Sequence, residues 1–564
     1  MGRGAKTGGL TRAATQAGWK PVALSVTFHY DKGFGPARRR AETASSPGEK
    51  TRIMAHVVVV GAGIAGVPAA YSLKAKLGPQ DRVTVISDRD YFHFVPSNPW
   101  VAMGWRKRGD VAFPIGPYLA GRGIDFVCQS LERIAPEANQ VHLADGSAVE
   151  YDFLLLATGP KPAFGEIEGM GPEGGYTHSI LHIEHAVKAF AAYREFLKDP
   201  GPIIVGVAQN AATIGPAYEF AFLADADLRR RNMRDQVPIT VVTPEPYVGH
   251  LGVGGKGETR GLLETALHHH GIAFVCNAKT LRVTPGQLHI AQYDADGTVQ
   301  TAHTLPFAFS VYWPPFRGAD ALANSPGLAD GRGFVTVDEY LRSPGHPNIF
   351  AVGLCRAHGV TARTPIPVGP PESVYSIQND VDTAVANIAA ALKGEAPASA
   401  APRRAQWLRD MGETGASYLT APQIPLRDIN WLKEGWWVHM AKVEFEKYFL
   451  DKIKLKPAAG SPGWSTHVAT ALTRRQVQRG GGAAREVPGP AMRPFEVPLE
   501  RDLSIELKAL AKALDVAANT LAGELLNAAI LDARLYLSEE VLALTQQVRR
   551  ELLADGWPEG PADT

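Results

Sequence analysis

A run of valines followed by three spaced glycines limits the possible fold more than any other stretch of the chain. Val57 to Val60 form a continuous apolar run, which is typical of a buried parallel strand. Gly61, Gly63 and Gly66 follow at the spacing of a dinucleotide-binding turn. In such a turn the first glycine permits the tight bend, the second lets the backbone approach a pyrophosphate, and the third lets the helix pack on the strand. The stretch therefore predicts a nucleotide-binding unit, whose anion lies on the N–H groups that open the helix.

The residues after this turn support the same unit. An Ala/Leu/Lys-rich segment, 69–77, predicts the helix, and 82–87 predicts a second strand. Ser87 and Asp88 end that strand, where an acidic group usually binds the ribose hydroxyls, although Asp88 comes one residue late.

The segment 90–100 contains two prolines, which enforce an extended path and remove backbone donors. Such a loop suits contact with a flat ring, so we expect Asn98 and Pro99 to lie against the cofactor.

Further strands are expected at 151–159, 333–338 and 347–353, followed by a helix over 380–392. Small-residue turns end two of these strands, and the predicted cofactor contacts there are Thr158, Gly159 and Gly353.

A second unit of the same kind begins at 202–208, but its glycine pattern is degenerate after Gly206. A nicotinamide nucleotide therefore has weak support there. The run 268–270 contains three histidines on an expected surface helix. Since a metal site needs i, i+4 spacing or mixed ligands, we predict no metal.

Composition limits the class of protein. A chain of 564 residues exceeds one typical domain, and its net charge of +1 gives no electrostatic drive toward nucleic acid. No run of 18 apolar residues occurs. The three cysteines, Cys128, Cys276 and Cys355, are too widely spaced for a CxxC pattern, so we expect buried reduced thiols in a cytosolic protein.

Several blocks in preserved order resemble the sulfide:quinone oxidoreductase family over roughly residues 54–456. The resemblance implies an α/β fold of two interleaved Rossmann-like domains that bind FAD. It also implies a donor site on one flavin face, a quinone on the other, and monotopic attachment to a membrane. The blocks are Phe94-Val-Pro-Ser-Asn-Pro-Trp-Val, Ala157-Thr-Gly-Pro-Lys, Gly215-Pro-Ala-Tyr-Glu-Phe, Glu245-Pro-Tyr-Val-Gly-His-Leu-Gly, Thr364-Pro-Ile-Pro-Val-Gly, Asp410-Met-Gly-Glu-Thr-Gly and Val438-His-Met-Ala-Lys-Val-Glu-Phe-Glu-Lys-Tyr-Phe.

This sequence departs from the family at the residues that perform its chemistry. The family oxidises sulfide with cysteines, which capture HS⁻ as a persulfide. At the three corresponding positions this chain has Thr213, Leu181 and Trp407. Because a threonine hydroxyl cannot replace a thiolate, we expect that the usual trisulfide route is lost.

Three further positions are candidate catalytic residues by resemblance. A family lysine near the flavin N1 and C2 oxygen is Glu372 here, and a carboxylate would destabilise the anionic reduced flavin unless it is protonated or turned away. His185 and His250 match positions near the sulfide pocket, which suggests proton transfer; a structural role is the alternative.

Residues 430–456 combine aromatic side chains with a fringe of lysines. This pattern suits a helix in the headgroup plane with its lysines pointing outward, and a core helix is the alternative. With the resemblance, we expect peripheral membrane contact and quinone entry here.

The ends of the chain lie outside the resemblance. Residues 1–53 are basic, and we interpret them as an over-called start before Met54 or as a disordered arm. Residues 457–492 are linker-like. Residues 493–564 predict an α-helical module that weakly resembles ribbon-helix-helix proteins; its acidic excess argues against DNA, so homo-oligomerisation is the preferred interpretation.

The sequence thus predicts an FAD-dependent oxidoreductase that passes electrons from a small-molecule donor to a membrane quinone. We assign 54–200 and 331–400 to the FAD-binding domain, 201–330 to the second domain and 401–456 to the quinone and membrane segment. The expected location is the cytoplasmic side of the inner membrane, or the cytoplasm. The alternatives are an NAD(P)H:quinone reductase and a flavoprotein that has lost redox activity and serves as a scaffold or sensor.

Overall fold

The computed structural model describes residues 54–252, 258–358, 363–370, 372–400, 405–412, 414–421, 429–434 and 436–455. The predictions for the N-terminal 53 residues, the linker and the C-terminal module therefore lie outside the described residues, and they stay predictions.

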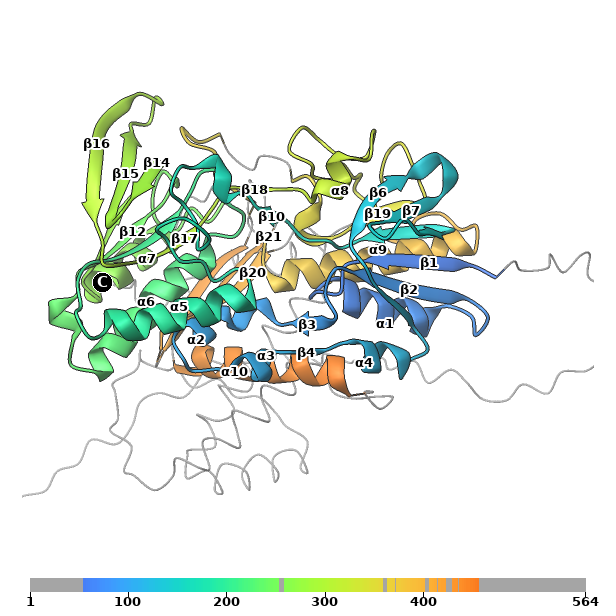
Figure 1. Ribbon diagram of the computed structural model, residues 1–564, viewed down its shortest axis with the longest axis horizontal. Helices are drawn as coiled ribbons and strands as arrows, with labels where there is room; N and C mark the ends of the chain where they lie inside the picture. The colour runs from blue at the N-terminus through green and yellow to red at the C-terminus, as the bar shows by residue number, and fades with distance from the viewer. Residues whose placement is uncertain are drawn as a thin grey trace, which may run out of the picture. The chain divides into compact units, whose positions relative to one another are not determined.

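A five-stranded parallel sheet carries the valine run. Its strand order is β5-β2-β1-β9-β19, so the chain order reverses on either side of β1. Figure 1 shows β1 and β2 side by side in this sheet. Val57 and Val59 pack into one core and Val58 and Val60 into another, because alternate side chains of a strand point to opposite faces. The strands are β1 (His56–Val60), β2 (Arg82–Ser87), β5 (Asp125–Cys128), β9 (Phe153–Leu156) and β19 (Ile349–Ala351).

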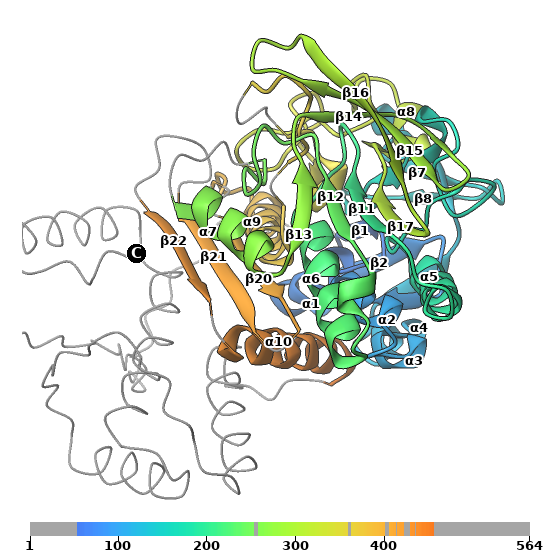
Figure 2. The same ribbon diagram turned by 90° about the vertical axis from the view of Figure 1, so that its left-hand side faces the viewer.

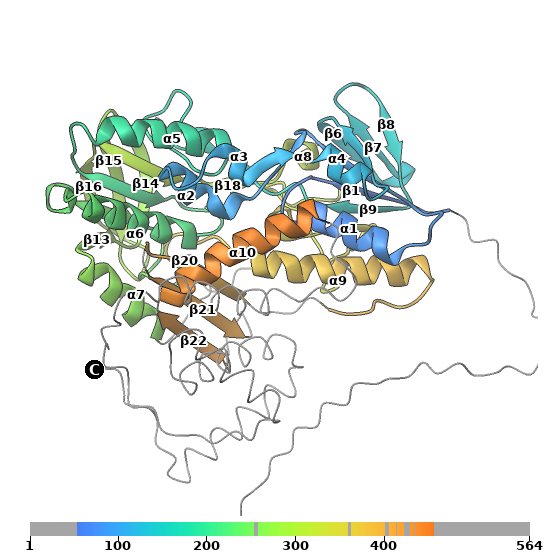
Figure 3. The ribbon, with the colours of Figure 1, turned by 90° about the horizontal axis from the view of Figure 1, so that it is seen from below.

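Helices cover one face of this sheet and a small antiparallel sheet covers the other. Helices α1 (Gly66–Lys76) and α9 (Val374–Leu392) pack side by side on the first face (Figure 3). The other face is covered by β6 (Leu131–Ala135), β7 (Gln140–Leu143) and β8 (Ala148–Glu150).

A second parallel sheet repeats this plan with four strands in the order β13-β12-β11-β17 (Figure 2). Its strands are β11 (Ile203–Val207), β12 (Ile239–Val242), β13 (Ile272–Val275) and β17 (Phe309–Trp313). Around them lie α5 (Ile183–Phe196), α6 (Gly215–Arg230) and α7 (Glu258–His269), and the antiparallel strands β14 (Ala278–Thr284), β15 (Gln287–Tyr293) and β16 (Val299–Pro306). The chain leaves the first sheet after β9 and returns to it at β19, so the predicted interleaving is confirmed.

Shorter elements connect the two sheets. Two antiparallel two-stranded sheets are β3 (Tyr91–His93) with β4 (Ala112–Pro114), and β10 (Lys161–Pro162) with β18 (Phe316–Arg317). Short helices are α2 (Asn98–Ala102), α3 (Arg108–Val111), α4 (Gly116–Ala120) and α8 (Asp320–Ala323). A third antiparallel sheet contains β20 (Ala405–Asp410), β21 (Gly415–Ala421) and β22 (Ile429–Glu434), and α10 (Trp436–Lys454) follows it.

The prediction of a strand at 333–338 is wrong. Only isolated bridges form there, from Val335 to Ala329 and to Arg356. The Asp338 carboxylate accepts the N–H groups of Tyr340 and Arg342, which closes a turn where the sequence pattern had indicated an extended strand.

The predicted outward orientation of the lysines in 430–456 is also wrong for Lys442. It is buried and forms an ion pair with Glu219 of α6. On the same helix Phe449 and Ile453 belong to the main core, and Phe449 packs against the rings of Phe92 and Phe94. This side of α10 is therefore a core face, the alternative given above. Among the residues whose placement is described, no helix has the length and apolar character needed to cross a bilayer.

Candidate flavin site

The glycine turn after β1 has the geometry that each of its glycines requires. Gly61 has a φ of +115°, and a Cβ on Gly66 would overlap the carbonyl oxygen of Gly61. A Cβ on Gly63, in contrast, would meet nothing within 4 Å. Two glycines are thus needed for the chain to pack on itself, whereas the space above Gly63 is open for a ligand, which is the division of roles that a bound pyrophosphate requires. The turn fits FAD.

The other predicted cofactor contacts lie along the same edge of the sheet. Because β1, β2, β9 and β19 are parallel, their carboxyl ends bring Gly61, Ser87, Thr158–Gly159 and Gly353 to one side. Ligands of open parallel sheets bind at this edge, where the strand order reverses. Asp88 is exposed at the end of β2, so its side chain is accessible to a ligand.

Asn98 and Pro99 are both buried at the start of α2. The Asn98 side-chain oxygen lies 2.6 Å from His93 Nε2, and its amide donates to the Ile180 carbonyl oxygen at 2.6 Å. These bonds attach the 90–100 segment to the segment before α5. The extended path predicted for 90–100 is wrong after residue 94, because Val95–Ser97 form a 3-10 turn and α2 begins at Asn98. The described role of Asn98 is to fix this segment, and its contact with the cofactor stays a prediction.

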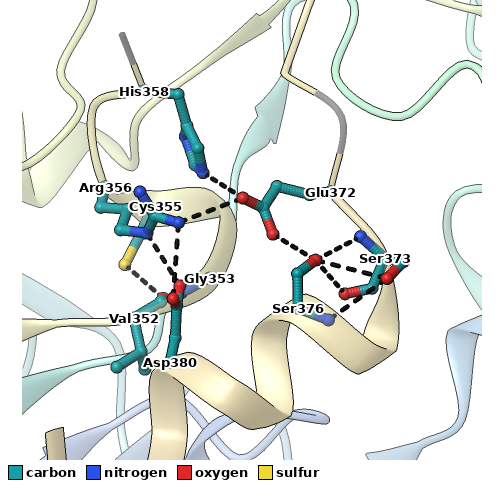
Figure 4. A network of polar contacts seen from close by, with 9 residues as sticks. All are labelled: Val352, Gly353, Cys355, Arg356, His358, Glu372, Ser373, Ser376 and Asp380. Atoms are coloured by element: carbon teal, nitrogen blue, oxygen red, sulfur yellow. Dashed lines mark hydrogen bonds and ion pairs between the residues drawn. The ribbon is translucent and has the colours of Figure 1, made fainter. Parts of the chain in front are cut away.

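Glu372 is the centre of a buried polar network at the N-terminus of α9 (Figure 4). Its Oε1 accepts from Arg356 Nη2 at 3.1 Å and lies 2.8 Å from His358 Nε2, while its Oε2 accepts from the Ser376 hydroxyl at 2.7 Å. Arg356 also donates from Nε to Asp380 at 2.8 Å, and Asp380 accepts the Gly353 N–H at 3.1 Å. The network therefore joins Glu372 to the cofactor edge of the first sheet.

The ionisation of Glu372 follows from these partners. Burial alone would raise the pKa of this carboxyl, but the hydrogen bond and charge of His358, the Arg356 guanidinium and the Ser376 hydroxyl lower it below its ordinary value. Glu372 is thus an ionised carboxylate. Its charge is paired with Arg356, so the unpaired negative charge considered in the sequence analysis is not what the structure has.

The corresponding turn of the second sheet is filled by the chain itself. A Cβ on Gly206 would overlap the Tyr312 ring, and the Asn210 N–H donates to the Pro367 carbonyl oxygen at 3.1 Å. Gly369 packs so closely on Ala211 that a Cβ there would overlap its carbonyl oxygen. The position that a second pyrophosphate would take is therefore occupied by the segment around residue 367.

Thr213 lies in this second turn with a φ of +61°. This conformation is costly for a β-branched residue and is common at functional sites. The side chain is half-buried, which leaves it accessible at the start of α6.

The two candidate histidines have different surroundings. His185 lies in the first turn of α5, 3.9 Å from Glu173 Oε1, and its Nδ1 is buried without a hydrogen-bond partner. Burial lowers its pKa, so it is neutral at pH 7. His250 is buried after β12, where its Nδ1 accepts the Gly252 N–H at 3.2 Å. The neutral tautomer of His250 therefore carries its proton on Nε2.

The three cysteines are free and lie in separate places. Cys128 is exposed at the end of β5 and Cys276 is partly buried after β13, so the expectation that all three are buried is correct only for Cys355. The Cys355 thiol donates to the Leu156 and Val352 carbonyl oxygens at 3.2 Å, and burial raises its pKa. A buried thiol of raised pKa is a poor nucleophile.

Sequence reasoning did not identify Arg356, Asp380, Asp410 or His439 as site residues. Asp410 is buried, and it accepts from Trp100 Nε1 at 2.7 Å and lies 2.8 Å from His439 Nδ1. Little signal marked Asp380, because α9 also contains Asp382 and other polar residues. Arg356 gave none, since its partners are 16 and 24 residues away.

The fold and the glycine turn define a two-domain, FAD-dependent flavoprotein oxidoreductase. Residues 55–387 match the family model of the pyridine nucleotide-disulphide oxidoreductases. The chain is 36% identical over 402 residues to a sulfide-quinone reductase from Aquifex aeolicus, a match that covers 71% of this chain and 91% of the relative. The solved structure of the sulfide:quinone oxidoreductase from that bacterium superposes with a TM-score of 0.67 at 35% identity, with the same coverage of both chains. An NADH dehydrogenase-like protein of Mycobacterium tuberculosis is 24% identical over 308 residues, 53% of this chain and 72% of that protein. The chain belongs to the sulfide:quinone oxidoreductase family.

Proposed function

We propose that the protein passes two electrons from a small donor to a quinone and that no cysteine of its own carries the donor. Bound FAD would supply the two-electron transfer. The quinone is supported by the name of the Aquifex aeolicus relative, sulfide-quinone reductase, and by the family to which both chains belong.

The placement of the thiols carries the proposal for the donor side. A trisulfide route needs two cysteines that can form a bond, but all three thiols are free and lie at or beyond the ends of three different strands. The positions of the family cysteines are occupied by Thr213, by Leu181, which packs against the core, and by Trp407. The donor is then a small species that reacts with the flavin without a protein persulfide, and His185, His250 and Thr213 are the side chains proposed to contact it.

Two polar pairs on α10 support the quinone side, because reduction of a quinone to a quinol takes up two protons. Lys442 forms a buried ion pair with Glu219, and the partly exposed His439 lies 2.8 Å from Asp410. Burial raises the pKa of Glu219, so this carboxyl holds a proton more readily than an exposed one. We propose that these groups supply protons, and that the peripheral membrane contact lies near Leu455, an exposed leucine after α10, on the cytoplasmic side of the inner membrane.

The alternative of an NAD(P)H:quinone reductase is opposed by the closed second turn, in which Asn210 and Gly369 are engaged with the chain itself. One observation supports the alternative of a scaffold without redox activity: Glu372 replaces a family lysine. The ion pair between Glu372 and Arg356 weakens this support.

Anaerobic titration of the flavin absorbance tests the proposal. We expect the oxidised band near 450 nm to persist after NADH and after one equivalent of sulfide, and a dithionite-reduced sample to be reoxidised by decylubiquinone. Bleaching by sulfide that is lost when all three cysteines are replaced would restore a thiol route, and bleaching by NADH would favour the nicotinamide alternative. A reduced flavin that no quinone reoxidises would favour the scaffold.

A further inference from the structure

A cavity of about 280 Å³ lies between the end of α6 and the start of α10. Its lining includes Trp100, Trp105, Arg106, Arg230, Gly412 and His439. None of these residues belongs to the glycine turn or to the network around Glu372. The volume is just below the range of ligand pockets, about 300 to 1,000 Å³, so the occupant is small.

Each arginine of the cavity is stacked on an indole ring. The Arg106 guanidinium lies 4.6 Å from the centroid of Trp100, and that of Arg230 lies 4.4 Å from the centroid of Trp105. Stacking holds a planar guanidinium in place while its N–H groups remain free to point sideways at a ligand. Both arginines are therefore preorganised as donors.

Arg230 stands out among three consecutive arginines at the end of α6. Arg229 donates to Asp225 at 2.8 Å and Arg231 donates to Asp227 at 2.7 Å, so both neighbours are neutralised on their own helix. Within the described ranges, no carboxylate lies within ion-pair distance of Arg230. Its charge is available to the cavity.

Arg106 and His439 each keep one side-chain nitrogen that can donate to a ligand. Arg106 uses Nε on Glu446 at 2.8 Å and Nη1 on the Trp105 carbonyl oxygen at 3.0 Å, which leaves Nη2. His439 uses Nδ1 on Asp410, which leaves Nε2. The Asp410 carboxylate accepts from Trp100 Nε1 and the Gly412 N–H and lies 2.8 Å from His439 Nδ1, so its oxygens are engaged with the chain.

Gly412 brings the turn after β20 close enough to complete the cavity. Its φ is +97°, and a Cβ there would overlap the Cβ of Ala226 on α6 and lie 3.7 Å from Arg230 Nη2. The position therefore requires glycine. The close approach places the turn directly beside the Arg230 guanidinium.

We infer that this cavity binds a phosphate group. Donors from three elements, namely the segment after α2, the end of α6 and the start of α10, surround one small space. A tetrahedral oxyanion offers oxygens in several directions and suits such a set, whereas a planar carboxylate is satisfied by one guanidinium fork. The phosphate belongs either to a soluble compound or to the headgroup of a membrane lipid.

Calorimetric titration of the full-length, FAD-loaded protein with inorganic phosphate, at ionic strength matched with chloride, tests the site. We expect Arg230→Gln to weaken phosphate binding at least tenfold, since it removes a charged hydrogen-bond donor. Arg230→Lys keeps the charge without the fork and should give an intermediate affinity. Arg194→Gln, at an exposed arginine of α5, is the matched control and should bind like the wild type. The flavin content should stay the same throughout.

Vesicle co-sedimentation identifies the source of the phosphate. If the site holds a lipid headgroup, phosphatidylglycerol in phosphatidylcholine vesicles will retain the wild type more strongly than Arg230→Gln. If it holds a soluble compound, both proteins will sediment alike while the calorimetric difference remains. Equal affinities of Arg230→Gln and Arg194→Gln for inorganic phosphate would overturn the site.

Discussion

The Arg356 guanidinium lies 3.1 Å from the buried carboxylate of Glu372, at the N-terminus of α9. The same guanidinium is 2.8 Å from Asp380, so one cation is shared between two carboxylates beside the Gly353 backbone. This arrangement sets the local charge of the flavin site more than the substitution at position 372 considered alone.

Glu372→Gln keeps the shape of the side chain and removes its charge. Since Arg356 retains Asp380, we expect a moderate loss of stability, about 1–3 kcal/mol, in urea unfolding. With one negative charge fewer, the reduced flavin should be easier to form, and its two-electron midpoint potential should rise by roughly 30 mV for each 1.4 kcal/mol gained. Glu395→Gln, at an exposed position after α9, is the control. An unchanged potential in Glu372→Gln would show that the network does not act on the flavin.

The lowered pKa values of two histidines predict how the stability of the protein depends on pH. Burial lowers the pKa of His93 to about 4 and that of His182 to about 4. Between pH 4 and 6.5 the unfolded chain therefore binds more protons than the folded one. The stabilisation is fully present above about pH 6.5 and is lost progressively as the pH falls toward 4, by up to ~3 kcal/mol for His93.

The urea midpoint at pH 7.5 and pH 5 measures this loss. We expect the difference between the two midpoints to shrink in His93→Gln, which cannot titrate, while His269→Gln at an exposed histidine of α7 keeps the wild-type difference. A His93→Gln protein with the full acid sensitivity would contradict this explanation.

Alanine substitutions of Gly66 and Gly63 in the first turn should have different effects. Gly66→Ala places a methyl group on the Gly61 carbonyl oxygen, so we expect a destabilised protein with a melting temperature lowered by several degrees. Gly63→Ala meets open space in the chain, so the fold should persist while the methyl group hinders the pyrophosphate. Circular dichroism and the 450 nm to 280 nm absorbance ratio separate the two effects. Normal flavin content in Gly63→Ala would contradict the assigned pyrophosphate position.

The first sheet could be predicted because its signals are local. Four valines and a glycine mark β1, and the second strand was predicted with the bounds that the structure has, Arg82–Ser87. The segment 333–338 is also rich in apolar residues, but the Asp338 carboxylate at its end accepts the N–H groups of Tyr340 and Arg342, and this turn competes with continuation of a strand. Periodicity alone does not register such competition.

The site was harder to predict because its charges act in pairs. Glu372 was recognised from its position, whereas Arg356 comes from the loop after β19 and Asp380 from the second turn of α9. Only the packing of α9 on the first sheet brings the three together. For the same reason Lys442 was predicted to point outward. Only the folded chain places Glu219 of α6 beside it.

Reoxidation of the reduced flavin by decylubiquinone, in the wild type and in a variant that combines Cys128→Ser, Cys276→Ser and Cys355→Ala, tests the central claim most directly. If electrons pass from the flavin to a quinone without any protein thiol, the two proteins will be reoxidised at rates within about twofold of each other. A variant that binds FAD normally but is reoxidised tenfold more slowly, or a wild type that decylubiquinone does not reoxidise, would contradict the account.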